Sequence, residues 1–148
     1  MSLQQMITDV GGKVMSKTHR MILQVSGGRL LNSAFGMPAV ELQTIGRKSG
    51  KKRSTMLTSP LNDEHRVVVV ASKGGDDRDP DWYTNLTANP DVEITIRGET
   101  RELRARTASA AEKAELWPQI VKAYKGYGGY QTKTERDIPV VICEPRPA

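Results

Sequence analysis

Residues 40–58 read VELQTIGRKSGKKRSTMLT. Apolar and polar side chains alternate over residues 40–45, and a second extended run covers residues 54–58, so this stretch predicts two strands joined by a loop. The basic loop, residues 46–53, contains two glycines that permit tight turns, and five of the seven residues from Arg47 to Arg53 are Lys or Arg. Clustered cations beside exposed backbone amides predict a site for a multiply charged anion.

The positive charge of the chain is local. Residues 1–53 contain nine Lys or Arg and two Asp or Glu, a net charge of +7, whereas residues 54–148 contain thirteen and fifteen, a net charge of −2. Together they give the net charge of +5 of the whole chain. This asymmetry favours a local anion site or a membrane-facing surface over a protein that binds nucleic acid with its whole surface.

Length and composition predict a single domain in the cytoplasm. A chain of 148 residues suits one domain. No stretch approaches the roughly 20 apolar residues that a membrane-spanning helix needs. Lysine and arginine interrupt the apolar residues near the N-terminus, so we expect no secretory signal. Cys143 is the single cysteine and lies in an apolar run, where we expect a buried structural thiol in a reducing compartment.

Six strands and three helices are expected around the basic loop. The expected strands are residues 39–45, 53–60, 66–72, 91–97, 100–107 and 138–143, and the expected helices are residues 13–25, 81–88 and 110–124. Four consecutive valines within residues 66–72 are typical of a strand buried on both faces, and this strand is expected to form a hairpin with residues 53–60. The pattern predicts a mainly β, α+β fold, a small barrel of about six mostly antiparallel strands.

Local signals define the helix ends and two segments of the chain. Asp79 is the expected N-cap of the second helix, with Pro80 at its first position, and Ser109 the N-cap of the third. Pro118 is expected to kink or divide the third helix. Residues 1–35 are interpreted as an N-terminal tail with an amphipathic helix, and residues 36–148 as the barrel domain. The cationic helix at residues 13–25 either covers one end of the barrel or contacts an anionic membrane surface.

The common catalytic and metal-binding motifs are absent from the sequence. It contains no GxSxG, Walker A or HExxH motif, and its only histidines are His19 and His65. We therefore expect no metal site and no serine-histidine-aspartate triad.

Two further features accompany the basic loop. Residues 71–75 read ASKGG and follow the valine strand, where small side chains let a flat ring approach the backbone. Tyr124, Tyr127 and Tyr130 are spaced by three, which on a helix places three phenols on one side. Such a set usually packs in a core, but the neighbouring glycines favour a mobile cover over a pocket. Together these features predict a long ligand with an anionic tail and a flat head.

Several motifs in a fixed order resemble one known family. They are TIGRKSG at 44–50 with Arg53, VVASKGG at 69–75, PDWYTNL at 80–86, ANP at 88–90, LWP at 116–118, the three tyrosines, and DIPVV at 137–141. Through them, residues 38–145 resemble the deazaflavin (coenzyme F420)-dependent nitroreductase and quinone reductase family of actinobacteria, whose split β-barrel is related to that of flavin reductases.

The resemblance implies an activity, a cofactor and a set of site residues. The implied reaction is hydride transfer from reduced F420 to a quinone, a nitroaromatic or an activated alkene, and Tyr130 is the implied catalytic proton donor, with Tyr127 or Ser72 second. The phosphate and polyglutamate tail of F420 would be held by Arg47, Lys48, Ser49 and Arg53. The deazaflavin would be lined by Ser54, Thr55, Met56, Leu57, Thr58, Val70, Ala71, Ser72, Lys73, Asp81, Trp82, Tyr83, Thr84, Asn85 and Tyr127.

This chain departs from the family pattern on its second strand. Lys52 stands where many relatives have proline, and Met56 stands where many have the proline of a Pro-Leu pair. These departures leave the coenzyme prediction intact and leave the substrate range open.

Three other functions are alternatives. An FMN-binding barrel needs fewer cations than the five of the basic loop, since FMN has one phosphate. A nucleic-acid-binding barrel that uses residues 47–53 should place stacking aromatics on its strands. The chain has seven aromatics, and most lie in residues 81–85 and 124–130, so we expect no nucleic-acid partner. A coenzyme carrier without turnover is the third alternative, and the protein is expected to be a monomer or a homodimer.

Overall fold

One antiparallel sheet of seven strands organises the computed structural model, which describes residues 36–147. The strands are β1 (Ala39–Ile45), β2 (Lys52–Thr58), β3 (Leu61–Asn62), β4 (Val67–Val70), β5 (Asp91–Ile96), β6 (Glu99–Thr107) and β7 (Val140–Pro145), in the sheet order β2-β1-β5-β6-β7-β4-β3. The helices are the short 3-10 turn η2 (Lys73–Gly75), α3 (Asp81–Ala88), α4 (Ala110–Ala123) and α5 (Gly126–Thr132). The predicted mainly antiparallel α+β fold is confirmed. The segment 1–35, with its predicted helix at 13–25, lies outside the described residues.

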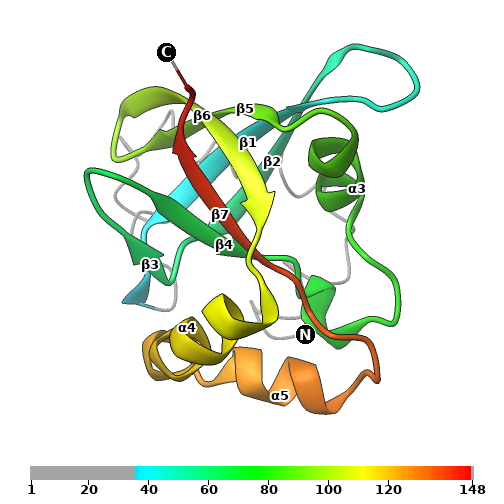
Figure 1. Ribbon diagram of the computed structural model, residues 1–148, viewed down its shortest axis with the longest axis vertical. Helices are drawn as coiled ribbons and strands as arrows, with labels where there is room; N and C mark the ends of the chain where they lie inside the picture. Colours follow the sequence, from blue (N-terminus) through cyan, green and yellow to red (C-terminus); the bar gives the residue numbers. More distant parts are fainter. Residues whose placement is uncertain (1–35, 148) are drawn as a thin grey trace.

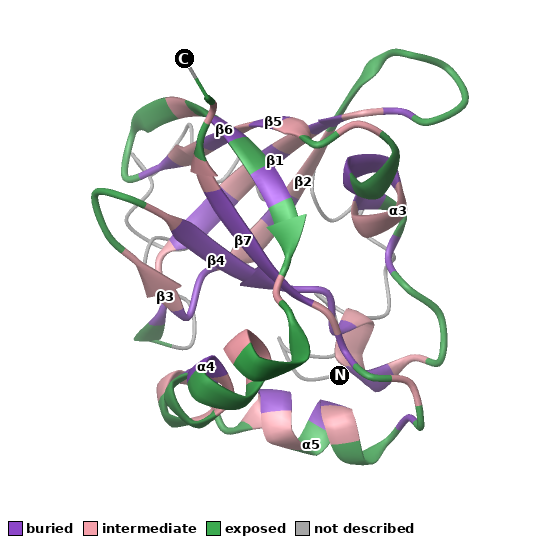
Figure 2. Ribbon diagram, in the orientation of Figure 1, coloured by how far each residue is buried: buried purple, intermediate pink, exposed green. Residues whose placement is uncertain are grey.

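The sheet curls so that its two faces pack against different partners (Figure 1). Along β4 the side chains alternate: Val67 and Val69 join the barrel core on the inner face, and Val68 and Val70 join an outer core beneath α4 and α5. All four valines are buried (Figure 2). The prediction that this strand is buried on both faces is therefore confirmed.

The predicted hairpin between residues 53–60 and 66–72 is wrong. β2 pairs with β1, whereas β4 pairs with the two-residue strand β3 and with β7. The chain leaves β2 at Ser59, whose buried hydroxyl donates to the carbonyl oxygens of Leu61 at 2.9 Å and Val68 at 2.6 Å. Pro60 has no N–H to continue a ladder, so the chain crosses to a new partner strand here. This crossing adds the seventh strand.

The predicted extent of α3 is confirmed, but its N-cap lies one residue later than predicted. Pro80 is the N-cap and Asp81 the first helical residue. The carboxylate of Asp79 instead pairs with Arg136 at 3.1 Å. The carbonyl oxygen of Pro80 accepts from the N–H groups of Tyr83 and Thr84, so backbone contacts take the place of a side-chain cap.

The C-terminal helices are more continuous than the sequence indicated. α4 runs from Ala110 to Ala123 without a division at Pro118. Pro118 cannot donate to the carbonyl oxygen of Ala114, and Ala114 is an exposed residue. The glycine-rich stretch that predicted mobility is the helix α5. Gly126 lies so close to the ring of Tyr124 that a Cβ atom would be 2.4 Å from it, so this glycine serves close packing.

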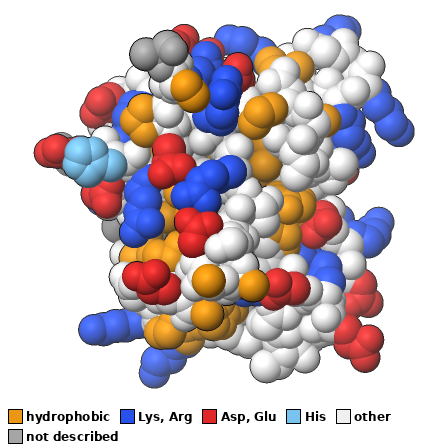
Figure 3. Space-filling model, viewed as in Figure 1, with side chains coloured by type: hydrophobic (Ala, Val, Ile, Leu, Met, Phe, Trp, Pro, Cys, Tyr) orange, Lys and Arg blue, Asp and Glu red, His pale blue; other side chains and the backbone are white. Residues whose placement is uncertain are grey.

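Ion pairs cover the outer surface of β6 and β7. Arg106 pairs with Glu112 at 2.8 Å and with Glu144 at 2.7 Å, and Arg104 pairs with Asp91 at 3.1 Å. Figure 3 shows acidic and basic side chains alternating over this face. Contact with Arg106 lowers the pKa of Glu112 to about 2. The arginines of this surface are therefore neutralised by neighbouring carboxylates, whereas the basic loop has an excess of positive charge.

The single cysteine and the described helices bear on two expectations from the sequence. Cys143 is buried between the strands, and desolvation raises the pKa of its thiol to about 12, as expected for a structural thiol. Within residues 36–147, none of the helices has the length and apolarity needed to traverse a bilayer.

The N-cap of α4 generates a prediction about stability. The Ser109 hydroxyl accepts from the Glu112 N–H while the Glu112 carboxylate accepts from the Ser109 N–H, which forms a capping box. Ser109→Ala should reduce the free energy of unfolding by about 1 kcal/mol, since one cap acceptor is lost. Urea denaturation measures this, and Ser109→Asp, which retains an acceptor, should stay close to wild type. Equal midpoints for wild type and Ser109→Ala would contradict the capping role.

Candidate functional site

The basic loop is the turn of the β1–β2 hairpin. The Gly46 N–H donates to the Lys51 carbonyl at 2.8 Å, the Gly50 N–H donates to the Gly46 carbonyl at 2.9 Å, and the Lys51 N–H donates to the Ser49 hydroxyl at 3.2 Å. These bonds close residues 46–51 into a compact turn. Figure 1 shows the turn projecting beside α3.

Arg47 attaches this turn to α3. Oδ1 of Asn85 accepts from the Arg47 N–H at 3.2 Å and from its guanidinium at 2.9 Å, and Asp81 lies 3.7 Å from the guanidinium. Asn85 is buried, and its amide reaches the hydroxyl of Thr44 on β1 at 3.5 Å. The backbone amide and the guanidinium of Arg47 therefore both hold the turn in place against α3.

The other cations of the turn divide into two kinds. Lys52 pairs with Glu93 of β5 at 3.3 Å. Lys48, Lys51 and Arg53 are exposed and form no ion pair with any residue of the described range 36–147. Figure 3 shows basic side chains projecting at this corner of the molecule. Three cations therefore remain available for an external anion, and one of them, Lys51, was not among the predicted ligands although it belongs to the same basic run.

The predicted residues of β2 are divided between its two faces. Leu57 packs against the barrel core, and Thr55, two residues earlier, shares its face. On the opposite face, the Ser54 hydroxyl donates to Glu41 at 2.9 Å, and the Thr58 hydroxyl lies 3.3 Å from the hydroxyl of Tyr127. The structure thus brings one face of β2, but not both, to the tyrosines of α5.

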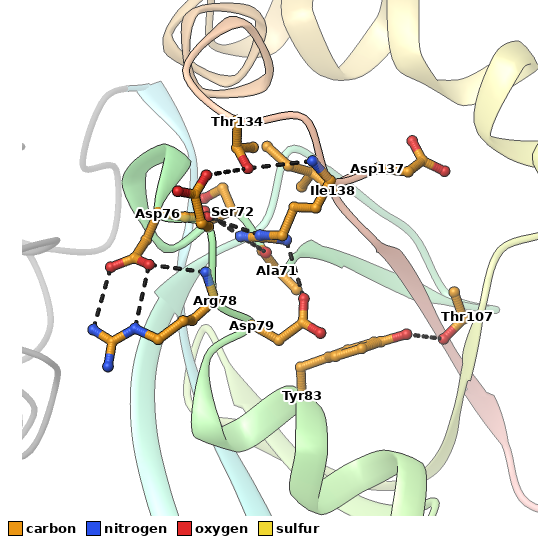
Figure 4. Close-up of polar contacts among 12 residues, drawn as sticks. Ala71, Ser72, Asp76, Arg78, Asp79, Tyr83, Thr107, Thr134, Asp137 and Ile138 are labelled. Carbon is orange, nitrogen blue, oxygen red and sulfur yellow. Dashed lines mark hydrogen bonds and ion pairs between the residues drawn. The ribbon is translucent and has the colours of Figure 1, made fainter.

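The predicted residues of α3 also point in different directions. Asp81 and Asn85 face the basic loop through Arg47. Trp82 is buried in the barrel core, and the hydroxyl of Tyr83 lies 2.7 Å from that of Thr107 at the end of β6 (Figure 4). Asp81 and Asn85 of α3 therefore adjoin the basic loop, while the two aromatic side chains of this helix pack elsewhere.

The three tyrosines form one contact cluster. Their ring centroids lie between 5.3 and 6.3 Å apart, with edge-to-face geometry. Tyr127 and Tyr130 are 6% and 7% exposed and belong to the outer core, and the hydroxyls of Tyr124 and Tyr130 lie 3.4 Å apart. Burial raises the pKa of Tyr127 to about 12, and burial followed by the contact with Tyr130 raises the pKa of Tyr124. Tyr124 and Tyr127 therefore stay protonated at neutral pH, as hydrogen-bond donors must.

The segment after β4 carries the remaining predicted residues. Val70, Ala71 and Ser72 are buried, and Lys73 begins η2 with a left-handed backbone, φ 44°. η2 packs against α5, so Ser72 and Lys73 lie at the end of the sheet that α5 covers. The amino group of Lys73 forms no ion pair within the described part of the chain.

The attachment of Arg47 predicts that Asn85 controls the order of the basic loop. Asn85→Ala leaves the Arg47 amide without its partner, which should cost about 1–3 kcal/mol of stability and free the turn. Trypsin should then cleave faster after Lys48 and Lys51, as measured by mass spectrometry of timed digests. Asn89→Ala, at the other end of α3, is the control and should leave cleavage of the turn unchanged. Equal cleavage rates in Asn85→Ala and wild type would show that the contact does not order the turn.

Comparison with known proteins identifies the family. Residues 15–145 match the family model described as F420H(2)-dependent quinone reductase. The F420H(2)-dependent quinone reductase Rv1261c of Mycobacterium tuberculosis is 38% identical over 140 residues, which cover 91% of this chain and 93% of that protein. A solved F420-H2 dependent reductase, FDR-A, is 42% identical with a TM-score of 0.66 over 72% of this chain and 94% of its own. A second solved structure, described as a domain-swapped dimer, is 38% identical with a TM-score of 0.69 over 88% of this chain and 96% of its own. The resemblance is confirmed, and the chain belongs to the F420H(2)-dependent quinone reductase family.

Proposed function

We propose that this protein is an F420H2-dependent oxidoreductase that reduces a quinone. The dependence on F420 follows from the family to which the chain belongs. The observation that carries the proposal is the set of three exposed cations, Lys48, Lys51 and Arg53, on a turn that Arg47 attaches to α3.

This donor set fits the coenzyme's anionic tail. A phosphate followed by glutamates carries several negative charges, and three cations without ion-pair partners within residues 36–147 can neutralise several charges together. FMN, with one phosphate, would use fewer of them. Arg47 is already engaged with Asn85, so we assign the tail to Lys48, Lys51 and Arg53 and the orientation of the turn to Arg47.

The coenzyme supplies the redox chemistry, since a deazaflavin has carbon in place of N5 and favours two-electron hydride transfer. The protein's contribution is binding, orientation and the supply of a proton. Ser72 and Lys73, at the end of β4, and Thr58, on the face of β2 nearest α5, are the proposed neighbours of the ring. Each lies on a segment in contact with α5.

Tyr130 is the proposed proton donor to the substrate oxygen, with Tyr127 or Ser72 as alternatives. The Tyr127 hydroxyl lies 3.3 Å from that of Thr58, and α5 packs against η2, the turn that follows Ser72. The Tyr124 hydroxyl lies 3.4 Å from that of Tyr130, and burial raises the pKa of Tyr124, so this neighbour stays a neutral hydrogen-bond partner of Tyr130.

Further acceptors, location and assembly belong to the same proposal. Nitroaromatics and activated alkenes are proposed as alternative electron acceptors, because hydride transfer suits any electron-poor ring or double bond.

We place the protein in the cytoplasm, with the cationic residues 13–25 at an anionic membrane surface where lipid-soluble quinones reside. Co-sedimentation with anionic vesicles tests this, and no binding would refute it. A homodimer is the proposed assembly, since one relative is described as a domain-swapped dimer; monomeric elution would exclude it.

The deciding experiment compares three ligands. Oxidised F420, FMN and single-stranded DNA are each titrated with the protein and followed by fluorescence, and oxidation of F420H2 by menadione is then measured. We expect binding of F420 and menadione-dependent turnover. Tight binding of FMN without binding of F420 would overturn the proposal, and binding of F420 without turnover with any acceptor would point to a carrier.

The anionic tail predicts a salt-dependent loss of affinity in a loop variant. Lys48→Ala combined with Arg53→Ala should raise the Kd for F420 about tenfold at low salt, because two exposed charge contacts are lost. The difference from wild type should shrink as salt rises, since screening weakens these contacts in the wild type. Lys122→Ala, an exposed cation on α4, is the control. An unchanged Kd for the double variant would remove the loop from the coenzyme site.

The proton-donor role predicts a loss of turnover without a loss of binding. Tyr130→Phe removes only the hydroxyl and should reduce kcat with menadione about 100-fold, the usual contribution of a positioned acid. The Kd for F420 should stay within about twofold of wild type. Tyr127→Phe provides the comparison between the two candidate donors. Full turnover by Tyr130→Phe would show that another group supplies the proton.

A further inference from the structure

One arginine side chain connects the segments that the proposed function assigns to the coenzyme and the substrate. Arg136 lies in the connection between α5 and β7, and its side chain is only 16% exposed. Its guanidinium contacts four acceptors on the clamped loop, residues 71–79: the carbonyl oxygens of Asp76 (2.8 Å), Ser72 (2.9 Å) and Ala71 (3.2 Å), and Oδ1 of Asp79 (3.1 Å). Figure 4 shows these acceptors gathered from one loop.

The clamped loop has a backbone that needs such an anchor. Lys73, Gly74 and Gly75 have consecutive positive φ angles of 44°, 64° and 86°. A left-handed conformation costs a side-chain-bearing residue such as Lys73 about 1–2 kcal/mol, and it persists only where the surroundings hold it. The carbonyls of Ser72 and Asp76, directly before and after these three residues, both accept from Arg136. The arginine therefore fixes both ends of the left-handed turn.

The same connection holds the clamped loop against α5. The buried Thr134 hydroxyl donates to Oδ1 of Asp77 at 2.8 Å. A Cβ atom on Gly75 would lie 2.8 Å from the carbonyl oxygen of Tyr130 and 2.9 Å from Cβ of Lys133, so the loop backbone touches the end of the tyrosine helix directly. A movement of the loop away from Arg136 would therefore change its position relative to the tyrosines.

The contact of Arg136 with Asp79 extends the arrangement to α3. Asp79 directly precedes Pro80, the N-cap of α3, and α3 holds the basic loop through the contact of Asn85 with Arg47. Arg136 thus contacts the loop from its first carbonyl at Ala71 to the beginning of the helix that adjoins the anion site.

We propose that Arg136 is a positioning residue for the F420 site, an inference that rests on the proposed function. It holds Ser72 and Lys73 at a fixed place relative to Tyr127 and Tyr130, and it acts through the loop without touching the coenzyme or the substrate. Lysine cannot take this role, because three of the four contacts need the planar fork of the guanidinium to reach separate carbonyls. Replacing the Arg136 guanidinium should therefore weaken the binding of F420.

The test uses Arg136→Met and Arg136→Lys in the full chain, with oxidised F420 as the probe. Both variants should raise the Kd for F420, followed by fluorescence, and the KM for F420H2 about tenfold. Without coenzyme, trypsin should cleave faster after Lys73 and Arg78, which reports the freed loop independently of activity. Asp79→Asn keeps the three carbonyl contacts and should produce a smaller rise in Kd.

Two controls separate positioning from general destabilisation. Ser109→Ala weakens α4 without contacting the clamped loop, and Arg78→Ala removes a side chain that is 78% exposed on the loop itself. Both should keep the Kd for F420 within about twofold of wild type.

Three outcomes overturn the inference. The first is a folded Arg136→Met variant that binds F420 as tightly as wild type, and the second is an equal loss of affinity in Ser109→Ala. The third is full recovery of affinity in Arg136→Lys. If Arg136→Met does not fold, Arg136→Lys and Asp79→Asn decide by the same criteria. Failure of the wild type to bind F420 would instead overturn the proposed function itself, and the inference with it.

Discussion

Burial of β4 on both faces is the constraint on which the arrangement of the molecule depends. Its four valines need apolar partners on two sides, and the barrel core supplies only one. Leu116 and Ile120 of α4, with Tyr127 and Tyr130 of α5, supply the other. The requirement to cover a strand therefore brings the tyrosine helix to the end of β4, where the chain leaves the sheet at Ser72.

Polar side chains then attach the loops to this apolar framework. Asn85 holds the basic loop to α3, and Arg136 holds the clamped loop to the connection after α5. Both side chains are largely buried. Asn85 contacts the amide and the guanidinium of Arg47, and Arg136 contacts three carbonyl oxygens and the carboxylate of Asp79. Hydrogen bonds to a charged group at such buried positions are strong and directional. Among the cations of these loops and connections, Arg47 and Arg136 hold the loops in place, whereas Lys48, Lys51 and Arg53 are exposed and are the proposed partners of an external anion.

The sequence was a good guide where local pattern determines structure. Four features could be predicted because each has a signal in the local sequence pattern: the strands of the β1–β2 hairpin, the double burial of the valine strand, the capping of α4 by Ser109 and the extent of α3. The partner of β4 could not, since the choice depends on Ser59 and Pro60 redirecting the chain to a strand near its C-terminus. The glycines of α5 predicted mobility, whereas the structure forms a helix there and packs Gly126 against the ring of Tyr124, a contact that composition alone does not reveal. The basic loop and the tyrosines were identified as site candidates, but neither the division of the loop cations nor the contacts of Arg136 has a signal in the local sequence.

The pairing of β4 with β7 also has a consequence for how the chain folds. Val67 lies opposite Cys143, so the most apolar strand finds its main partner only when the last residues are present. Closing such a long loop costs entropy before any contact repays it, which slows folding of the sheet. During synthesis on the ribosome, the four consecutive valines of β4 emerge before β7 has been made. An unpaired strand of this composition can pair with a neighbouring chain. Truncation of the C-terminal strand would therefore leave an aggregation-prone intermediate in place of a smaller stable domain.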